Sequence, residues 1–461
     1  MEQYRIEKDG LGEIEVPESA YYGAGTMRAV NNFIDSGLRL PPGFIQALAL
    51  IKKHAAEVNH QLGLLPDEIA GAVSRAAREI QEGKFRDQFV VDVFQTGSGT
   101  STNMNMNEVL ASRANEILTG KRGGKSPVHP NDHVNLGQSS NDVIPSAIHL
   151  AALNAVQQHL RPSLSLLWKA LEEKAFEFKD IRKIGRTHLQ DAVPISLGQE
   201  FSGYARQIEW GLERIERLGS PLKELALGGT AVGNGLNTHP DFPSQVILAL
   251  SRETGLGLRE AENHFAAQAT QDAAVEASGA LKTLAVSLVK IANDIRWLAS
   301  GPRCGLGEIN LPALQPGSSI MPGKVNPVIP ESVLQISAQV VGNDAAITLG
   351  GQGGYFELNL MLPVIGYNLL QSIDLLGSGA ENFALKCIKG ITANKEKCAE
   401  NIEKSLALAT YLVPRLGYDR ATAVAKKAQA SGKNVLDIVR EEGLLTEEEI
   451  SRLYGDLTAR E

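Results

Sequence analysis

Two long apolar stripes restrict what this chain can fold into more than any other feature. Between residues 281 and 298, large apolar side chains recur at alternating spacings of three and four, at Leu281, Leu284, Leu288, Ile291, Ile295 and Leu298. This spacing is typical of a helix that packs one apolar face against other helices. Gly301 and Pro302 follow the stripe, and they predict that the helix ends before them.

A second stripe also uses spacings of three and four, at Phe201, Tyr204, Ile208, Leu212, Ile215 and Leu218, and it closes at Gly219. A third helical pattern runs from Val143 to about Phe178 and is interrupted at Pro162. Alternating patterns of the kind that mark β-strands are scarce. We therefore expect a mainly α protein with a central bundle of long helices and few strands.

Length and local composition predict three consecutive domains. The chain has 461 residues, which suits about three domains at roughly 150 residues each. We expect a mainly helical N-terminal domain at 1–139 and the long-helix bundle at 140–390. A small helical C-terminal domain at 391–461 begins with the charge-rich segment ITANKEKCAENIEK.

Charge and apolar content exclude several classes of protein. The chain has 45 Lys and Arg residues against 53 Asp and Glu residues, a net charge of -8, and no dense basic run. This balance argues against nucleic acid or an anionic membrane as a partner. No apolar stretch reaches the ~18 uninterrupted residues that a membrane span needs. The first residues also lack the order of a secretory signal, so we expect a cytoplasmic protein.

The cysteines and histidines do not form the pattern of a metal or redox site. Cys304, Cys387 and Cys398 show no CxxC spacing, so we expect reduced, buried side chains rather than disulfides. His129 and His133 are four residues apart, as in an HExxH zinc motif, but Pro130 occupies the position of the glutamate. We expect neither a metal nor another cofactor.

Polar, glycine-rich segments interrupt the helical background at 95–108, 228–240 and 314–327. A shorter polar segment, GQSSND, lies at 137–142, between the first two. The first offers hydroxyls, among them those of Ser98 and Thr100, beside backbone N–H groups, a surface that suits a carboxylate or a phosphate. It matches neither a P-loop nor a dinucleotide-binding turn. Its residues equally suit a structural role, in which they cap the following helix at Glu108.

Two further segments carry groups that are useful in catalysis. IGRTHLQDAVP at 184–194 places His188 between polar neighbours just before a helix, in either a structural or a catalytic role. The third polar segment brings Ser318, Ser319, Lys324 and Asn326 within ten residues of flexible backbone. Hydroxyls, a cation and an amide together suit the capture of an oxyanion, and the same segment also suits a solvated surface turn.

The segment GSSIMPGKVNP at 317–327 resembles the signature of the fumarase/aspartase superfamily. QTGSGTSTNMNMNE, HPNDHVNLGQSSND, GRTHLQDAVP and GGTAVGNGLNTHP resemble further blocks of that superfamily, in its order, and they are most similar to the class II fumarases. The resemblance implies a three-domain, mainly α fold in a homotetramer. It also implies a twenty-helix core and active sites shared by three subunits.

The resemblance also implies roles for individual residues. Ser318 would be the base that removes the carbon-bound proton, and His188, oriented by Glu331, would handle the proton of the departing water. Lys324 would capture a substrate carboxylate. The remaining substrate-binding positions implied by the resemblance are Ser98, Thr100, Ser139, Ser140, Asn141, Thr187, Ser319 and Asn326.

An accessory dicarboxylate site is implied at His129, Asn131 and Asp132. The sequence departs from the pattern beside it, because Ser126 stands where some fumarases carry an arginine, and this predicts weaker binding there. The implied reaction is the reversible hydration of fumarate, a small dicarboxylate, to L-malate. The features that favour that reaction are TGSGT, Ser140, GGTAVGNGLNTHP and GGQGGYFELN, whereas Ser101-Thr102, VIPE and ITANKE favour an aspartate ammonia-lyase. A catalytically silent, structural relative is the third reading.

Overall fold

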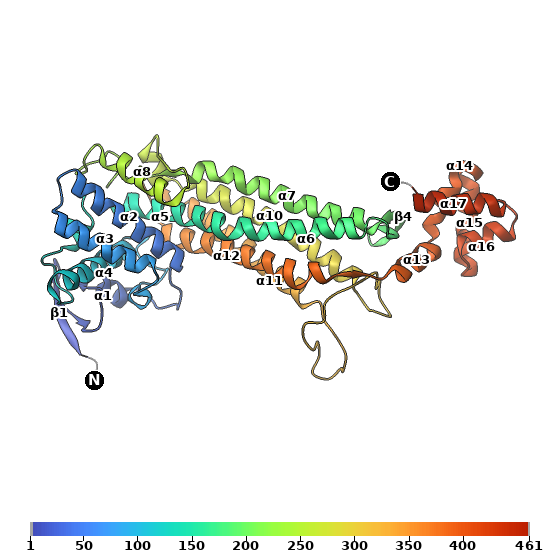
Figure 1. Ribbon diagram of the computed structural model, residues 1–461, viewed down its shortest axis with the longest axis horizontal. Helices are drawn as coiled ribbons and strands as arrows, with labels where there is room; N and C mark the ends of the chain where they lie inside the picture. The colour runs from blue at the N-terminus through green and yellow to red at the C-terminus, as the bar shows by residue number, and fades with distance from the viewer. Residues whose placement is uncertain (1–2, 460–461) are drawn as a thin grey trace. The chain divides into compact units, whose positions relative to one another are not determined.

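The computed structural model describes residues 3–459 (Figure 1). Met1, Glu2, Arg460 and Glu461, at the outer ends of the predicted first and third domains, lie outside the described residues. The described chain divides into two compact units. The first comprises Met1–Pro162, Gly211–Ala285 and Ile336–Ser378, and the second comprises Ser163–Trp210, Val286–Gln335 and Gly379–Glu461. The units do not consist of consecutive segments, and the bounds of the three predicted domains stay a prediction.

The first unit is built around helix α2, which packs against α3, α4, α5 and α8. Pro42 stands at the first position of α2, where its missing N–H costs nothing, and Leu48 and Ile51 are fully buried. The elements around α2 are β1 (Tyr4–Asp9), β2 (Gly12–Pro17), α1 (Ala24–Asn32), α2 (Pro42–Gln61), α3 (Asp67–Gln81), α4 (Thr100–Thr119), α5 (Ser140–Ala155), α8 (Phe242–Thr254) and α9 (His264–Ala269).

Short strands and single helical turns complete this unit. The strands pair as β1 with β2, β5 with β6 and β8 with β9. Their bounds and those of the turns are β5 (Glu224–Leu225), β6 (Arg259–Glu260), β8 (Gly354–Tyr355), β9 (Leu358–Asn359), a 3₁₀ turn at Arg86–Gln88 and π-helical turns at Pro130–Val134 and Val156–Leu160.

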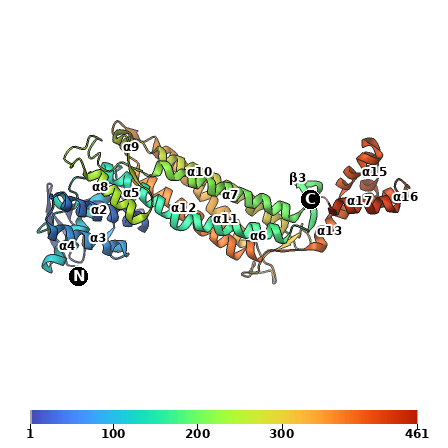
Figure 2. The ribbon, with the colours of Figure 1, turned by 45° about the horizontal axis from the view of Figure 1, so that its top comes forward.

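Five long helices account for the predicted bundle: α6 (Arg161–Glu177), α7 (Leu197–Leu222), α10 (Asp272–Leu298), α11 (Val328–Gly351) and α12 (Leu362–Lys386). Two views show α7 and α10 side by side (Figures 1 and 2). In the second unit, the Tyr204 hydroxyl on α7 donates to Asp294 on α10 over 3.0 Å. In the first unit, Lys282 on α10 donates to Asp344 on α11 over 2.5 Å. The mainly α fold with long helices is confirmed.

The predicted helix ends are correct in one case and wrong in two. Helix α10 ends at Leu298, before Gly301, as its stripe predicts. Helix α7 continues past Gly219 to Leu222 because the apolar face continues: Leu222 is buried one turn beyond Leu218. Pro162 does not interrupt its helix, because a π-helical segment at Val156–Leu160 precedes it. A wider turn there leaves room for the proline ring, which in a regular α-helix clashes with the carbonyl four residues earlier.

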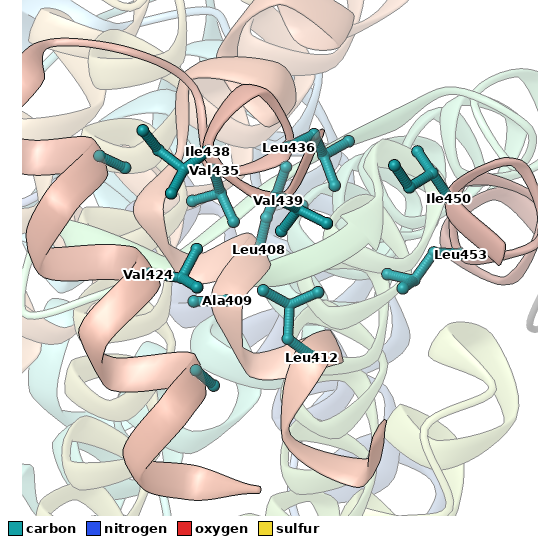
Figure 3. Packing of buried hydrophobic residues seen from close by; sticks show 12 residues of the cluster. Leu408, Ala409, Leu412, Val424, Val435, Leu436, Ile438, Val439, Ile450 and Leu453 are labelled. Atoms are coloured by element: carbon teal, nitrogen blue, oxygen red, sulfur yellow. The ribbon is translucent and has the colours of Figure 1, made fainter. Parts of the chain in front are cut away.

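The second unit adds a hairpin and the C-terminal helices. Strands β3 (Arg182–Thr187) and β4 (Gln190–Ser196) form the hairpin, and β7 (Ile309–Asn310) pairs with β10 (Thr392–Ala393). The last elements are a 3₁₀ turn at Ile388–Gly390, α13 (Lys395–Lys404), a 3₁₀ helix at Leu406–Leu412, α14 (Val413–Leu416), α15 (Tyr418–Ser431), α16 (Val435–Glu441) and α17 (Glu447–Ala459). Leu408, Val424, Val439 and Leu453 point into a common apolar core (Figure 3). Within the described residues, no helix combines the length and apolar character of a membrane span.

Candidate active site

Two helix N-termini meet at the first predicted loop. Thr100 is the first residue of α4 and Ser140 is the first residue of α5, and their hydroxyl oxygens lie 2.7 Å apart. The Ser98 hydroxyl lies a further 2.7 Å from that of Thr100. A helix N-terminus carries a partial positive charge and unpaired N–H groups, so two of them side by side attract an anion. The junction therefore suits a carboxylate.

Ser139 and Asp142 fix the start of α5. They form a reciprocal capping box, in which the Ser139 side chain accepts backbone N–H bonds and Asp142 accepts from the Ser139 N–H over 3.0 Å. The second Asp142 oxygen accepts from the backbone N–H groups of Gly228 and Thr230, each over 3.0 Å. Burial raises the pKa of this carboxyl, against the effect of the N–H donors. The second polar loop is thus tied to the same helix start.

Several predicted polar residues hold the loops themselves. The Asn141 side-chain amide donates to the carbonyl of Ala231 over 2.8 Å, which joins α5 to the second loop. The first polar segment is a loop only as far as Gly99, because α4 begins at Thr100. Glu108 lies within α4 and accepts bonds from the N–H groups of Gly23, Gly25 and Thr26. Glu108 therefore caps α1, and the prediction that the segment caps a helix at Glu108 is wrong.

A buried cation, Lys52, lies in the interior of this unit and was missed in the sequence. Its ammonium donates to the Asn135 side-chain oxygen over 2.9 Å, and that oxygen also accepts from Asn103 and Asn107. Burial lowers the pKa of Lys52 to about 7, and the charge of Asp142 acts in the opposite direction. A lysine within the apolar run of a helix was the available signal, because lysine is rarely buried without a partner.

His188 lies at the tip of a hairpin, where sequence reasoning expected only a segment before a helix. Strands β3 and β4 are joined by His188 and Leu189, with φ angles of 56° and 60°. Positive φ at both central residues normally selects Asn-Gly. Such a conformation costs of order 1–3 kcal/mol at each non-glycine residue and clusters at functional sites. Thr187 and His188 are both exposed at this strained turn.

Ser318 lies in the long connection between α10 and α11, which leaves the helices as an extended loop (Figure 1). The Ser318 oxygen accepts backbone N–H bonds from Ile320 over 3.2 Å and from Met321 over 3.0 Å. Donors aimed at a hydroxyl oxygen favour its deprotonated form. These two donors therefore suit an oxygen that carries negative charge.

Backbone contacts hold the shape of the Ser318 loop. The Gly317 N–H donates to the carbonyl of Lys324 over 2.8 Å, and the Asn326 amide donates to the carbonyl of Gly317 over 2.7 Å. A Cβ at position 317 would approach the Lys324 oxygen to 2.7 Å, so glycine is required there. The Lys324 and Ser319 side chains are exposed. The amide of Asn326 stabilises the loop, a use that the sequence did not reveal.

The predicted residues are divided between the two units. Thr187, His188, Ser318, Ser319, Lys324, Asn326 and Glu331 belong to the second unit, and the other predicted site residues belong to the first. Glu331 lies in the first turn of α11 and is half-buried. Among the described residues, His188 and Glu331 share no hydrogen bond, and the expected orientation of His188 by Glu331 stays a prediction.

The accessory residues gather in one turn. The His129 ring nitrogen Nδ1 accepts backbone N–H bonds from Asn131 and Asp132 over 3.2 and 3.1 Å, at the start of the π-helical turn Pro130–Val134. The side chains of Asn131 and Asp132 are exposed, and so is Ser126. These two bonds fix the orientation of the His129 ring. The accessory site stays a prediction.

The three cysteines form no disulfide among the described residues. All three cysteines are free, and Cys387 and Cys398 are buried, with burial raising the pKa of each thiol to about 12. Cys304 is exposed, so the expectation of burial is wrong there: it lies in the irregular connection after α10 rather than on a packed face. No cluster of three or more His, Cys, Asp or Glu side chains suited to a metal ion occurs among residues 3–459.

Comparison with known families agrees with this fold. A model described as a lyase matches residues 12–342, and a model described as the fumarase C C-terminus matches residues 408–454. The first match alone covers more than half of the chain. The two matches together show that the protein belongs to a lyase family.

Individual relatives show which family of lyases the chain belongs to. The class II fumarate hydratase of Nitrosomonas europaea is 56% identical over 428 residues, which cover 93% of this chain and 93% of the relative. That of Halobacterium salinarum is 55% identical over 448 residues, covering 97% and 95%. The crystal structure of a class II fumarase from Schistosoma mansoni matches with a TM-score of 0.94 at 41% identity and covers 98% of each chain. The chain therefore belongs to the class II fumarase family.

Proposed function

We propose that this protein is a hydro-lyase that catalyses the reversible hydration of fumarate to L-malate. The observation that supports the proposal is the joined N-termini of α4 and α5, where the Thr100 and Ser140 hydroxyls lie 2.7 Å apart and suit a carboxylate. The names of the relatives support fumarate over aspartate as the substrate, since both class II relatives and the structural neighbour are fumarases. The aspartate ammonia-lyase reading has no comparable support.

The chemistry requires stabilisation of a transient carbanion. In the dehydration direction, a base removes a proton from the carbon next to a carboxylate of malate, and the charge spreads into that carboxylate as an aci-carboxylate. Donors fixed before the reaction stabilise such charge, and removing one donor typically costs about 3 kcal/mol. Thr100, Ser140 and their helix ends are such donors in the first unit, and Lys324 is one in the second.

Ser318 is the proposed base. A serine hydroxyl is a weak base unless its surroundings stabilise the alkoxide, and the N–H groups of Ile320 and Met321 donate to its oxygen. In the hydration direction, Ser318 returns a proton to carbon while water adds to the other carbon. His188 is the proposed group that takes a proton from that water and returns it when water leaves, oriented by Glu331 of a neighbouring copy.

A homotetramer with shared active sites accounts for the division of the site residues. The long helices carry exposed apolar side chains, including Val286 and Trp297 on α10 and Val341 and Leu349 on α11. Apolar surface of this kind on long helices is typical of faces that bind further copies. We place the enzyme in the cytoplasm, a proposal that the three free cysteines support.

A single absorbance experiment tests the proposed reaction. Purified protein is incubated with L-malate, and separately with L-aspartate, and the ultraviolet band of fumarate is followed. We expect fumarate to appear from L-malate alone. Fumarate from L-aspartate alone would replace the proposal by an ammonia-lyase, and silence with both substrates would favour a structural relative.

A further inference from the structure

A fully buried carboxylate, Glu308, lies outside the set of predicted site residues. Two Arg186 nitrogens donate to its two oxygens, over 3.0 and 2.7 Å, in a bidentate pair. The Lys183 ammonium lies 3.3 Å from the same carboxylate, and Lys183 is also buried. Bidentate pairs fix orientation as well as distance. Glu308 therefore fixes the position of the strand that carries Arg186 and Lys183.

That strand is β3, which leads into the His188 turn. Lys183 and Arg186 are three residues apart, so in a regular strand they would face opposite sides of the hairpin. The pairing of β3 with β4 shifts register between Ile184 and Arg186, and both cations reach Glu308. Irregular pairing of this kind redirects side chains and is common beside active sites. The ion pairs with Glu308 thus fix the direction of β3 where it enters the His188 turn.

The turn beyond Arg186 needs such an anchor. His188 and Leu189 both have positive φ, and strained backbone persists only where its surroundings determine it. Across the described residues, the Thr187 and His188 side chains make no hydrogen bond of their own. The constraint on the tip therefore comes from the strand below it, and Arg186 is two residues from His188.

Glu308 is itself held from the C-terminal segment. The Asn401 amide on α13 donates to a Glu308 oxygen over 2.9 Å, and the Glu308 carbonyl accepts from the Asn394 N–H over 2.9 Å. Strands β7 and β10 pair directly beside these contacts. One carboxylate thus joins the His188 hairpin to the start of the C-terminal helices.

We propose that Glu308, through Arg186, is a positioning residue for His188, and that Asn401 holds Glu308 in the required orientation. This inference rests on the proposed role of His188 in proton transfer. Buried ion pairs add little to stability compared with apolar packing, so a role in orientation explains why charges are kept here. The pair fixes where the imidazole stands and acts on the reaction through His188.

The test variant is Arg186→Lys, which keeps the charge and loses the bidentate geometry. Its matched control is Arg113→Lys, because Arg113 on α4 forms an equivalent bidentate pair with Glu79 on α3, over 2.6 and 2.9 Å. We expect kcat for L-malate to fall about 10- to 100-fold in Arg186→Lys, since a misplacement of about 1 Å costs that much. We expect KM to change by less than about twofold, and kcat of the control to stay unchanged.

A second readout does not depend on activity. Hydrogen exchange at the backbone amides of residues 187–190 should be faster in Arg186→Lys than in the wild type and unchanged in Arg113→Lys. Asn401→Leu, which removes a single hydrogen bond, should shift both readouts in the same direction by a smaller amount, and it replaces Arg186→Lys if that protein does not fold.

The outcomes separate this proposal from the proposed function. Normal kcat or normal exchange in the Arg186→Lys and Asn401→Leu proteins would overturn the positioning role, and so would an equal loss of kcat in the Arg113→Lys control. If the wild-type protein turned over no malate, the proposed function would fail. Hydrogen exchange at the turn would then decide the positioning role by itself.

Discussion

Replacing Thr100 by valine removes one hydroxyl at the junction of α4 and α5 and keeps the shape of the side chain. In the free protein, that hydroxyl is within 2.7 Å of both Ser98 and Ser140. Two neutral hydrogen bonds contribute about 1–3 kcal/mol together. We therefore expect a loss of that size in the free energy of unfolding, measured by urea denaturation.

Thr100→Val should also lower the catalytic efficiency, kcat/KM. A hydrogen bond to a charged carboxylate is worth about 1.5–3 kcal/mol, and each 1.4 kcal/mol corresponds to a factor of ten, so kcat/KM for L-malate should fall about 10- to 150-fold. Initial rates from the fumarate band measure this. The loss should fall on kcat to the extent that the donor acts in the transition state.

Thr102→Val is the matched control for this prediction. Thr102 is buried in the same helix, and its hydroxyl donates to the Gln95 side chain over 2.9 Å rather than to the junction. Because this hydroxyl makes one hydrogen bond rather than two, we expect a loss of stability of about 0.5–1.5 kcal/mol, with kcat/KM unchanged. Equal losses of kcat/KM in both variants would refute the claim that the two helix ends bind substrate.

Three further predictions follow from other parts of the structure. Ser318→Ala should lower kcat at least about 10²-fold without changing the elution volume in size-exclusion chromatography, and a near-native rate would remove Ser318 from the role of base. Glu108→Gln should lower the free energy of unfolding by about 2–4 kcal/mol in urea, because N–H donors at the start of α1 lose their charged acceptor; a loss below about 0.5 kcal/mol would contradict the cap. Burial lowers the pKa of Lys52 from 10.5 to about 7, so the unfolded chain binds more protons between these values, and stability should rise with pH across that window. Lys52→Met should reduce this rise, and equal pH slopes in the two proteins would count against the assignment.

The long helices were predictable because their apolar spacing agrees with their packing. Leu281 to Leu298 form one buried face of α10, and the helix ends where the pattern ends. The end of α7 was not predictable from Gly219, because burial of Leu222 outweighs the local preference of glycine for a helix end. Tertiary packing decides such cases, and the local sequence carries no record of it.

The hairpin at His188, in contrast to the long helices, was not predictable from the local sequence. Its strands lack a clean alternation, and its turn is His188-Leu189 rather than a residue pair that favours positive φ. Local rules fail there because the turn is held by a distant carboxylate, Glu308, which no local pattern connects to β3. The sequence motifs identified the loops that carry the candidate residues, but not the partners that fix those loops.

Subunit complementation tests most directly whether separate copies of the chain complete one active site. A Ser318→Ala protein and a protein carrying both Thr100→Val and Ser140→Ala are each expected to be nearly inactive. Unfolded together and refolded as a mixture, they should recover about one quarter of the wild-type activity, because one site in four then combines two intact contributions from different copies. No recovery in a mixture that forms normal hybrid assemblies would contradict the shared site.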